Sequence, residues 1–285
     1  MKIKTNFKKK GEALGNKTVN SAAIDAEVVT KLKNNFELKE IGGHILNSVP
    51  QFIRDKNDYS RLWKCTKVPI HRDFIEYVKG VKESTYFKAL QKCGYGNLCP
   101  LCAWRLAQER AKELEAAFEY YKQLGYKFVL LTLTLPHYSH EDLEQNIKIL
   151  SDGWNYAKSH RRMRKFGKVS DWIYYRTLEV RIGENGWHPH YHFAIAIKED
   201  STEYFDELRS LWNSYLLKQG KKPNRHSFDI SMPKGGTDAL RDYLNKVTIS
   251  RELTSPHTKI GRNSYSQFDL LKVQKEIILN EGRAP

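Results

Sequence analysis

The sequence lacks any long hydrophobic run: its most apolar stretch, residues 128–135, is short and contains two threonines. A membrane-spanning helix needs about 20 apolar residues, so we expect no transmembrane segment. The N-terminal residues are basic but lack the apolar stretch and small-residue cleavage site of a secretory signal. We therefore expect a soluble, cytoplasmic protein that does not bind membranes.

Acidic residues are scarce relative to basic ones. The chain has 285 residues with 33 Asp and Glu against 48 Lys and Arg, which gives a formal net charge of +15. Its 40% hydrophobic and 12% aromatic residues argue against a disordered chain and suffice for a buried core. A strongly basic chain without a membrane segment indicates a polyanionic partner, and nucleic acid is the leading candidate.

Cysteine is rare, with four residues in the whole chain. In a chain without an export signal the thiols stay reduced, which favours metal ligands over disulfides. Cys99 and Cys102 form a Cys-x-x-Cys pair, whose sulfurs can both reach one tetrahedral ion at about 2.3 Å. Cys93 and Cys65 would complete a Cys₄ zinc site, which is structural because it has no open position. The alternative is that Cys65 is an ordinary buried thiol and that His71, or no residue, completes the site.

Hydrophobic periodicity and turn residues predict an α+β fold, in which helices flank a central antiparallel sheet. The predicted helices cover residues 104–124, a stretch from the N-cap Ser139 to about Arg164, 201–219 and 237–249. The predicted strands cover 128–135, 172–182, 188–197 and 228–231, with a hairpin turn around 183–187. We divide the chain into a basic N-terminal arm or cap (1–54), a zinc module with a linking helix (55–124), a core (125–250) and a C-terminal tail (251–285).

A basic run without acids lies near the middle of the chain. Its candidate phosphate-contacting residues are Arg161, Arg162, Arg164, Lys165 and Lys168. The alternative is a solvated helix end.

Three of the ten histidines fall close together, at His188, His190 and His192. In a strand they project from one face, and neighbours at i and i+2 lie about 6.5 Å apart at the backbone. If the hairpin turn centres between residues 184 and 185, Glu179 faces His190, while Thr177 and Arg181 face His192 and His188.

His190 and His192 are the favoured metal-binding pair, because His188 lies next to the turn. Two imidazoles and a carboxylate suit Mn²⁺ or Mg²⁺ acting as a Lewis acid on a phosphate. The alternatives are a hydrogen-bonded histidine cluster without a metal, or a zinc-hydrolase site.

Tyr243 and Lys246 form an i, i+3 pair on the predicted helix 237–249. A tyrosine can attack a phosphodiester once its phenol loses the proton, and a nearby ammonium favours the phenolate. The chain has 16 tyrosines, however, and spacing alone does not distinguish a nucleophile from a core residue.

Together these motifs resemble the plasmid rolling-circle replication initiators, the Rep proteins of the HUH endonuclease superfamily. The nearest branch carries a cysteine motif before the endonuclease core. The resemblance covers about residues 90–272 and rests on motifs at 99–105, 131–134, 178–180, 186–192 and 243–246.

The resemblance implies an HUH-type core: a five-stranded antiparallel sheet with the histidine strand in its centre and the tyrosine on an adjacent helix. It implies that His190 and His192 hold a divalent ion over the scissile phosphate of a double-strand origin. Tyr243 would attack that phosphate in single-stranded hairpin DNA, stay joined to its 5′ phosphate and leave a 3′ hydroxyl. The partners implied are origin DNA and the host helicase and polymerase.

The chain departs from this branch at one position. Close relatives carry a glutamate four residues before the tyrosine, where it activates water to end the cycle, whereas this chain has Ala239. Asp238 and Asp242 are the nearest acids, and both lie off the Tyr243 face of the predicted helix. The termination step is therefore left open.

Three other functions are compatible with these patterns. A relaxase or transposase of the same superfamily would use the same chemistry on another DNA hairpin. A non-enzymatic, zinc-containing DNA-binding protein would bind without cutting. An RNA-processing nuclease would cleave RNA without a covalent adduct.

Overall fold

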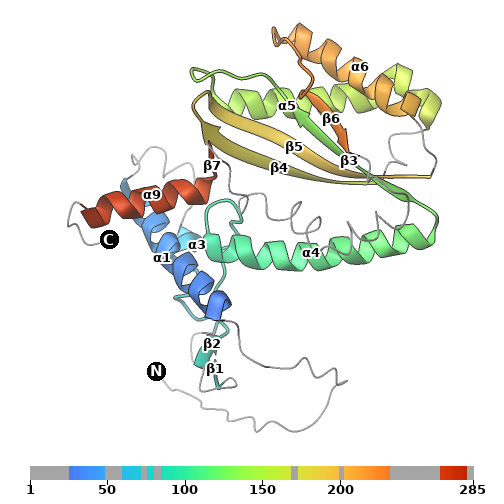
Figure 1. Cartoon of the computed structure of the whole chain (residues 1–285). Helices are drawn as coiled ribbons and strands as arrows, with labels where there is room; N and C mark the ends of the chain where they lie inside the picture. The colour runs from blue at the N-terminus through green and yellow to red at the C-terminus, as the bar shows by residue number, and fades with distance from the viewer. Residues whose placement is uncertain are drawn as a thin grey trace. The chain divides into compact units, whose positions relative to one another are not determined.

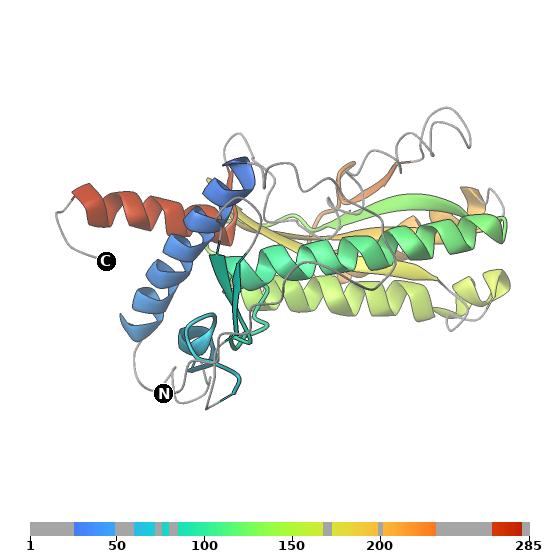
Figure 2. The same ribbon diagram turned by 90° about the horizontal axis from the view of Figure 1, so that it is seen from below.

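The computed structural model describes residues 26–48, 60–71, 76–79, 85–167, 173–198, 202–231 and 264–280 (Figure 1, Figure 2). The chain divides into two compact units, one made of residues 1–105 and 271–285 and the other of residues 106–270. Among the described residues, every helix is too short or too polar to span a membrane.

The first unit combines helices with a cysteine-rich core. Its elements are α1 (Ala26–Ser48), α3 (Ser60–Lys64), the antiparallel pair β1 (Glu76–Lys79) and β2 (Thr85–Lys88), the beginning of α4 (Pro100–Gln123) and the end of α9 (Gln267–Asn280). Leu62 and Leu101 pack against the four cysteines. Cys99 directly precedes α4 and Cys102 lies in its first turn, so the start of this helix sets the spacing of the two thiols.

The second unit is built on a five-stranded antiparallel sheet with the order β6-β3-β5-β4-β7 (Figure 1). Its strands are β3 (Lys127–Thr134), β4 (Tyr174–Gly183), β5 (Gly186–Ile197), β6 (Phe228–Ser231) and β7 (Ser264–Tyr265). The predicted α+β class with a central antiparallel sheet is confirmed. The histidine-bearing strand β5 lies in the middle of the sheet, as the resemblance implied.

One face of the sheet carries the main core. Alternate residues such as Leu131 and Phe193 pack there against Trp154 of α5 (Leu143–Ser159) and Trp212 of α6 (Thr202–Lys218). These two helices lie side by side on this face (Figure 1). Burial of these apolar side chains stabilises the fold by about 25 cal/mol per Å² of surface removed from water. The polar histidines of β5 therefore lie on the opposite face of the sheet.

The other face of the sheet is divided along its length. At one end Leu114 and Phe118 of α4 pack on the small residues Ala194 and Ala196 of β5. Toward the hairpin turn, the same face of β5 carries the histidines at 188, 190 and 192 instead of alanines. The change from alanine to histidine along one strand face therefore marks where helix packing ends and the polar site begins.

The predicted helix beginning at Ser139 and running to Arg164 is wrong at both ends. Asp142 is the N-cap, because its side chain accepts the N–H of Gln145 at 3.0 Å, and α5 begins at Leu143. At the other end His160 is extended, with ψ 144°, which stops α5 and caps the separate 3₁₀ helix η1 (Arg161–Phe166). The acids of the Ser-His-Glu-Asp stretch signalled a helix start correctly, but the cap lay three residues later.

The other elements that the sequence predicted and the structure describes are confirmed: α4, β3, the β4–β5 hairpin, α6 and β6 all lie within a few residues of their expected positions. The elements α1, α3, β1 and β2 of the first unit were not predicted. The predicted helix 237–249 lies outside the described residues. The expected C-terminal tail contributes β7, which pairs with the end of β4, and helix α9.

Candidate metal centres

The β4–β5 hairpin has the register predicted from a turn centred between residues 184 and 185. Its directly opposed pairs are Glu179 with His190, Thr177 with His192 and Arg181 with His188. Gly186 closes the turn at φ +84°, a conformation that favours glycine. A Cβ atom at Gly186 would lie 2.8 Å from Cα of Ser139, so the hairpin also needs a residue without a side chain here.

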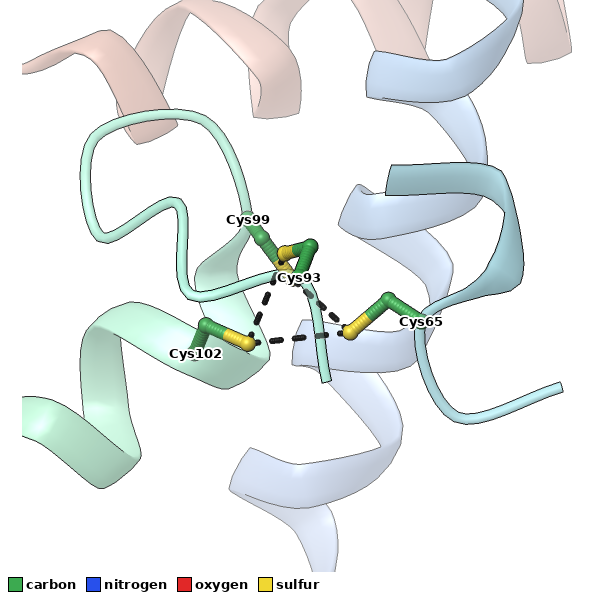
Figure 3. Close-up of side chains that lie close together, drawn as sticks. All are labelled: Cys65, Cys93, Cys99 and Cys102. Atoms are coloured by element: carbon green, nitrogen blue, oxygen red, sulfur yellow. Dashed lines mark hydrogen bonds between the residues drawn. The ribbon is translucent and has the colours of Figure 1, made fainter. Parts of the chain in front are cut away.

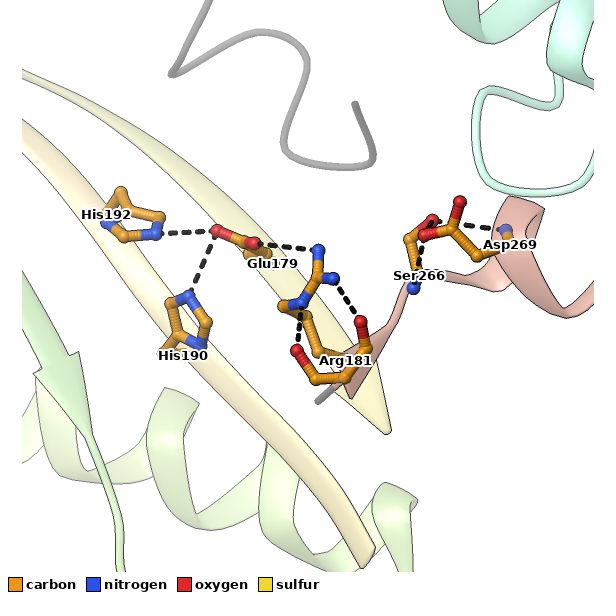
Figure 4. A network of polar contacts seen from close by, with 7 residues as sticks. Glu179, Arg181, His190, His192, Ser266 and Asp269 are labelled. Atoms are coloured by element: carbon orange, nitrogen blue, oxygen red, sulfur yellow. Dashed lines mark hydrogen bonds and ion pairs between the residues drawn. The ribbon is translucent and has the colours of Figure 1, made fainter. Parts of the chain in front are cut away.

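Glu179, His190 and His192 form a candidate three-ligand metal centre (Figure 4). Nε2 of His190 and Nε2 of His192 lie 3.0 Å and 2.9 Å from the same carboxylate oxygen, Oε2 of Glu179. The Glu179 side chain is 4% exposed, whereas those of His190 and His192 are 12% and 18% exposed. Two imidazoles and a carboxylate converging on one point can bind a divalent ion and leave coordination positions open.

Thr132 of β3 supports one of these histidines from the neighbouring strand. Its hydroxyl lies 3.1 Å from Nδ1 of His192, which it faces in the β3–β5 ladder. When Nδ1 carries the proton and donates it to this hydroxyl, the lone pair of Nε2 is directed at the site. By contrast, Nδ1 of His190 is buried without a hydrogen-bond partner among the described residues.

His188, the third histidine of the strand, lies outside the three-ligand group. Its ring stacks on that of His137, with centroids 4.5 Å apart, and lies 5.1 Å from that of His190. Burial, together with the neighbouring imidazoles of His190 and His137, lowers the pKa of His188 to about 4. His188 is therefore neutral at physiological pH.

The four cysteines form a second candidate metal centre (Figure 3). Sγ of Cys102 lies 3.5 Å from Sγ of Cys93 and 3.6 Å from Sγ of Cys65, and the Cys65 and Cys99 sulfurs are 3.8 Å apart. A tetrahedron with metal–sulfur bonds of about 2.3 Å has sulfur–sulfur edges of about 3.8 Å. These distances fit a Cys₄ metal site, whereas His71 is exposed and lies outside the group.

The cysteine site needs a cation for its thiols to ionise together. Burial raises the pKa of the Cys93 thiol to about 12. Hydrogen bonds from the Cys65 and Cys99 thiols lower the pKa of Cys102. In the metal-free protein the Cys102 thiolate therefore accepts hydrogen bonds from neighbouring thiols that keep their protons. A bound divalent cation would replace these protons and compensate the buried negative charge.

The basic run at 161–168 is partly used in ion pairs within the second unit. Arg162 pairs with Glu207 and Lys165 pairs with Glu203, each at 2.5 Å, and both acids belong to α6. Arg161 and Arg164 are exposed on η1. Lys168 lies outside the described residues. Sequence reasoning missed these pairs because the acids come from a distant helix, and nucleic-acid contact by this run stays a prediction.

The predicted nucleophile and its neighbour, Tyr243 and Lys246, lie outside the described residues, as do Asp238, Ala239 and Asp242. Their roles and the termination step remain predictions.

Comparison with known proteins finds similarity over the part of the chain that holds the histidine centre and most of the cysteine centre. Residues 87–218 match the replication-protein family. A relative from Staphylococcus aureus named "Protein rep" is 34% identical over 143 residues, which cover 48% of this chain and 58% of the relative. Relatives of the same name from a Bacillus species and from Streptomyces lividans are each 28% identical, over 48% and 55% of this chain and 45% and 46% of their own lengths.

The stretch that matches this family contains Glu179, His190, His192 and three of the four cysteines. The chain spans about half the length of these relatives. No solved structure gives a significant match.

Two residues that support the histidine centre, directly or through Arg181, were not selected as site residues from the sequence. Thr132 carried a signal, because it alternates with leucines along a buried strand and so points to the face opposite the core. Ser264, whose partner Arg181 adjoins Glu179, carried none, because its strand has two residues and follows a long interval in the chain.

Proposed function

We propose that this chain is a plasmid replication initiator that nicks and rejoins single-stranded DNA at a double-strand origin. The observation that carries the proposal is the convergence of Glu179 from β4 with His190 and His192 from the central strand β5, within the stretch that matches the replication-protein family. The relatives' shared name, "Protein rep", supports the same role.

Glu179, His190 and His192 would hold Mn²⁺ or Mg²⁺, and His188 is an additional candidate ligand beside them. The bound ion would supply Lewis-acid polarisation of a non-bridging phosphate oxygen. The side-chain exposure of the two histidines leaves a path by which a DNA phosphate can approach.

The proposed chemical step is a transesterification by Tyr243. Its phenolic oxygen forms a bond to phosphorus while the bond from phosphorus to the 3′ oxygen breaks. The phenolic proton leaves with the attack, favoured by the Lys246 ammonium, and a proton is taken up by the 3′ oxygen. The products are a 5′-phosphotyrosine linkage and a free 3′ hydroxyl that a polymerase can extend, and reversal of the step rejoins the strand.

The proposed substrate fits the charge of the protein. A net charge of +15 favours binding to a polyanion, and the exposed Arg161 and Arg164 are candidates for phosphate contact. In this proposal the Cys₄ group holds Zn²⁺ as a structural clasp, and the host helicase and polymerase act on the nicked origin.

The test uses end-labelled single-stranded DNA spanning the origin, incubated with Mn²⁺ and separated on a denaturing gel. The wild type should give a protein–DNA adduct that EDTA abolishes. Tyr243→Phe should give no adduct, whereas Tyr120→Phe, which changes an exposed tyrosine on α4, should behave as the wild type.

Other outcomes select another function. Metal-dependent cutting that persists in Tyr243→Phe would assign the nucleophile to a different tyrosine or to water. Tight binding without cutting at the verified origin would favour a non-enzymatic DNA-binding protein. A nick mapped to a transfer origin or a transposon end would indicate a relaxase or a transposase.

A further inference from the structure

The buried residue Arg181 connects the candidate metal ligand Glu179 to the edge strand β7 (Figure 4). Its Nη1 lies 3.7 Å from Oε1 of Glu179. On its other side, Nε donates to Oγ of Ser264 at 2.8 Å and Nη2 donates to the Ser264 carbonyl at 2.6 Å. The guanidinium is therefore held by two hydrogen bonds while its third nitrogen faces the carboxylate.

The local fold explains why these groups meet. Glu179 and Arg181 are two residues apart on β4, so their side chains leave the same face of the sheet. β7 pairs with the end of β4, with Ser264 opposite Gly183, which brings Ser264 within reach of Arg181.

The chain that carries Ser264 is held in place directly after β7. Ser266 is the N-cap of α9: its N–H donates to Oδ2 of Asp269 at 2.9 Å, and the N–H of Asp269 donates back to Oγ of Ser266 at 3.3 Å (Figure 4). This reciprocal capping box satisfies two backbone donors and fixes the chain as it enters the helix. Pairing of β7 with β4 and the capping box of α9 together hold Ser264 in place, so Ser264 can orient the Arg181 side chain.

The two oxygens of Glu179 face different partners. Oε2 faces both ligand histidines, and Oε1 faces Arg181. We propose that Arg181, anchored on Ser264, is a positioning residue that holds the Glu179 carboxylate in the orientation that binds the metal. This inference rests on the proposed function, because it takes the Glu179 and histidine group to be the metal centre.

Two effects of Arg181 on a bound cation oppose each other. Its positive charge repels the ion, whereas its fixed guanidinium prevents the carboxylate from rotating away from the histidines. The two bonds to Ser264 hold the guanidinium on the Oε1 side, so the charge stays behind the carboxylate. Groups that orient a ligating carboxylate in this way typically contribute about 10- to 100-fold to metal affinity, and we expect orientation to outweigh repulsion.

The test measures the affinity of the full chain for Mn²⁺ by calorimetry, with the melting temperature of each variant recorded separately. Arg181→Met should weaken Mn²⁺ binding by about 10- to 100-fold. Ser264→Ala should weaken it less, because the carbonyl of residue 264 still accepts from Nη2. Arg181→Lys keeps the charge but not the planar fork, and it should also bind Mn²⁺ more weakly than the wild type.

Arg176→Met is the matched control. Arg176 lies on the same strand but opposite Phe193, on the other sheet face, where its guanidinium lies over the ring of Tyr191. This variant should bind Mn²⁺ as tightly as the wild type. Unchanged or tighter Mn²⁺ binding by both Arg181→Met and Arg181→Lys would overturn the inference, whatever their melting temperatures.

A double variant separates this inference from the proposed function. His190→Ala combined with His192→Ala should abolish the Mn²⁺ site in an otherwise wild-type chain. If that double variant binds Mn²⁺ as the wild type does, the proposed metal centre is wrong, and with it this inference. If it loses binding and the Arg181 variants do not, the metal centre stands and only the positioning role fails.

Discussion

The two candidate metal centres differ in how completely the protein encloses them. The cysteine group offers four buried sulfurs at tetrahedral spacing, so a bound ion would have no position left for a substrate. The Glu179 and histidine group offers three ligands from the described part of the chain, two of them partly exposed, and these three leave coordination positions open. Ligand number and exposure therefore separate a closed metal site from one with open coordination positions, whichever ion each of them binds.

The centres also differ in how the chain brings their ligands together. Cys65 lies 34 positions before Cys99, whereas Glu179 lies 11 positions before His190 in one hairpin. Closing a longer loop costs more conformational entropy, and the four buried thiols ionise together only when a cation is present. We therefore expect metal binding to be coupled to folding at the cysteine centre, whereas the hairpin forms the other centre by strand pairing.

The largest difference between the two centres should appear when one ligand of each is removed. In the proposed zinc clasp, Cys102→Ser should prevent zinc binding and unfold the first unit, because structural zinc contributes roughly 10–16 kcal/mol of apparent binding free energy in zinc-finger peptides. Zinc content of the purified protein and thermal melting followed by circular dichroism measure this effect.

His71→Ala is the control, since His71 is exposed and outside the cysteine group. It should retain the zinc. A Cys102→Ser protein with wild-type zinc content and melting would show that the cysteine cluster is not a metal site.

At the other centre, His192→Ala should abolish metal binding and leave the fold intact. Loss of an orienting partner alone costs about 10- to 100-fold in metal affinity, so loss of a ligand should cost more than about 100-fold. The measurements are Mn²⁺ affinity by calorimetry and adduct formation with origin DNA, beside a melting curve. His188→Ala should lower the Mn²⁺ affinity less than His192→Ala does, because His188 stacks on His137 outside the group. A larger loss of affinity in His188→Ala would show that His188, and not His192, is the metal ligand.

The pH dependence of zinc affinity should show whether zinc displaces protons from the buried thiols. Burial raises the pKa of Cys93 to about 12, so this thiol is protonated below that pH in the metal-free protein. Zinc must displace the proton, and zinc affinity should therefore rise with pH and fall on acidification, by about tenfold per pH unit for each proton released.

Calorimetry of zinc binding in buffers of different ionisation enthalpy counts the released protons. A zinc affinity that is flat between pH 6 and 8 would contradict thiol ligation.

The smallest effect concerns the support of His192. Thr132→Val removes the hydroxyl beside Nδ1 with little change in shape and should weaken Mn²⁺ binding by about tenfold. Thr134→Val is the matched control, because Thr134 faces His190, whose Nδ1 has no partner among the described residues. If both substitutions lowered the Mn²⁺ affinity equally, strand packing and not the hydrogen bond between Thr132 and His192 would account for the loss.

Much of the histidine centre could be predicted because it depends on one hairpin. Side chains alternate along a strand with period two, and the turn sets which residues oppose each other. Once the turn was centred between residues 184 and 185, Glu179 had to face His190, and the structure confirms this pairing. The α5 cap was misplaced because Ser139 and Asp142 are both good N-caps, and local sequence does not decide which will bond to the backbone.

The composition, the strand alternation, the hairpin register and the Cys-x-x-Cys spacing predicted the α+β class and both candidate ligand groups, and the family resemblance implied the central place of the histidine strand. These features depend on residue type and on short-range geometry, which a sequence displays directly. The anchoring of Arg181 by Ser264 and the pairing of Arg162 with Glu207 became visible in the folded chain alone. They join segments far apart in sequence, and such contacts depend on how the core brings strands and helices together, which no local pattern records.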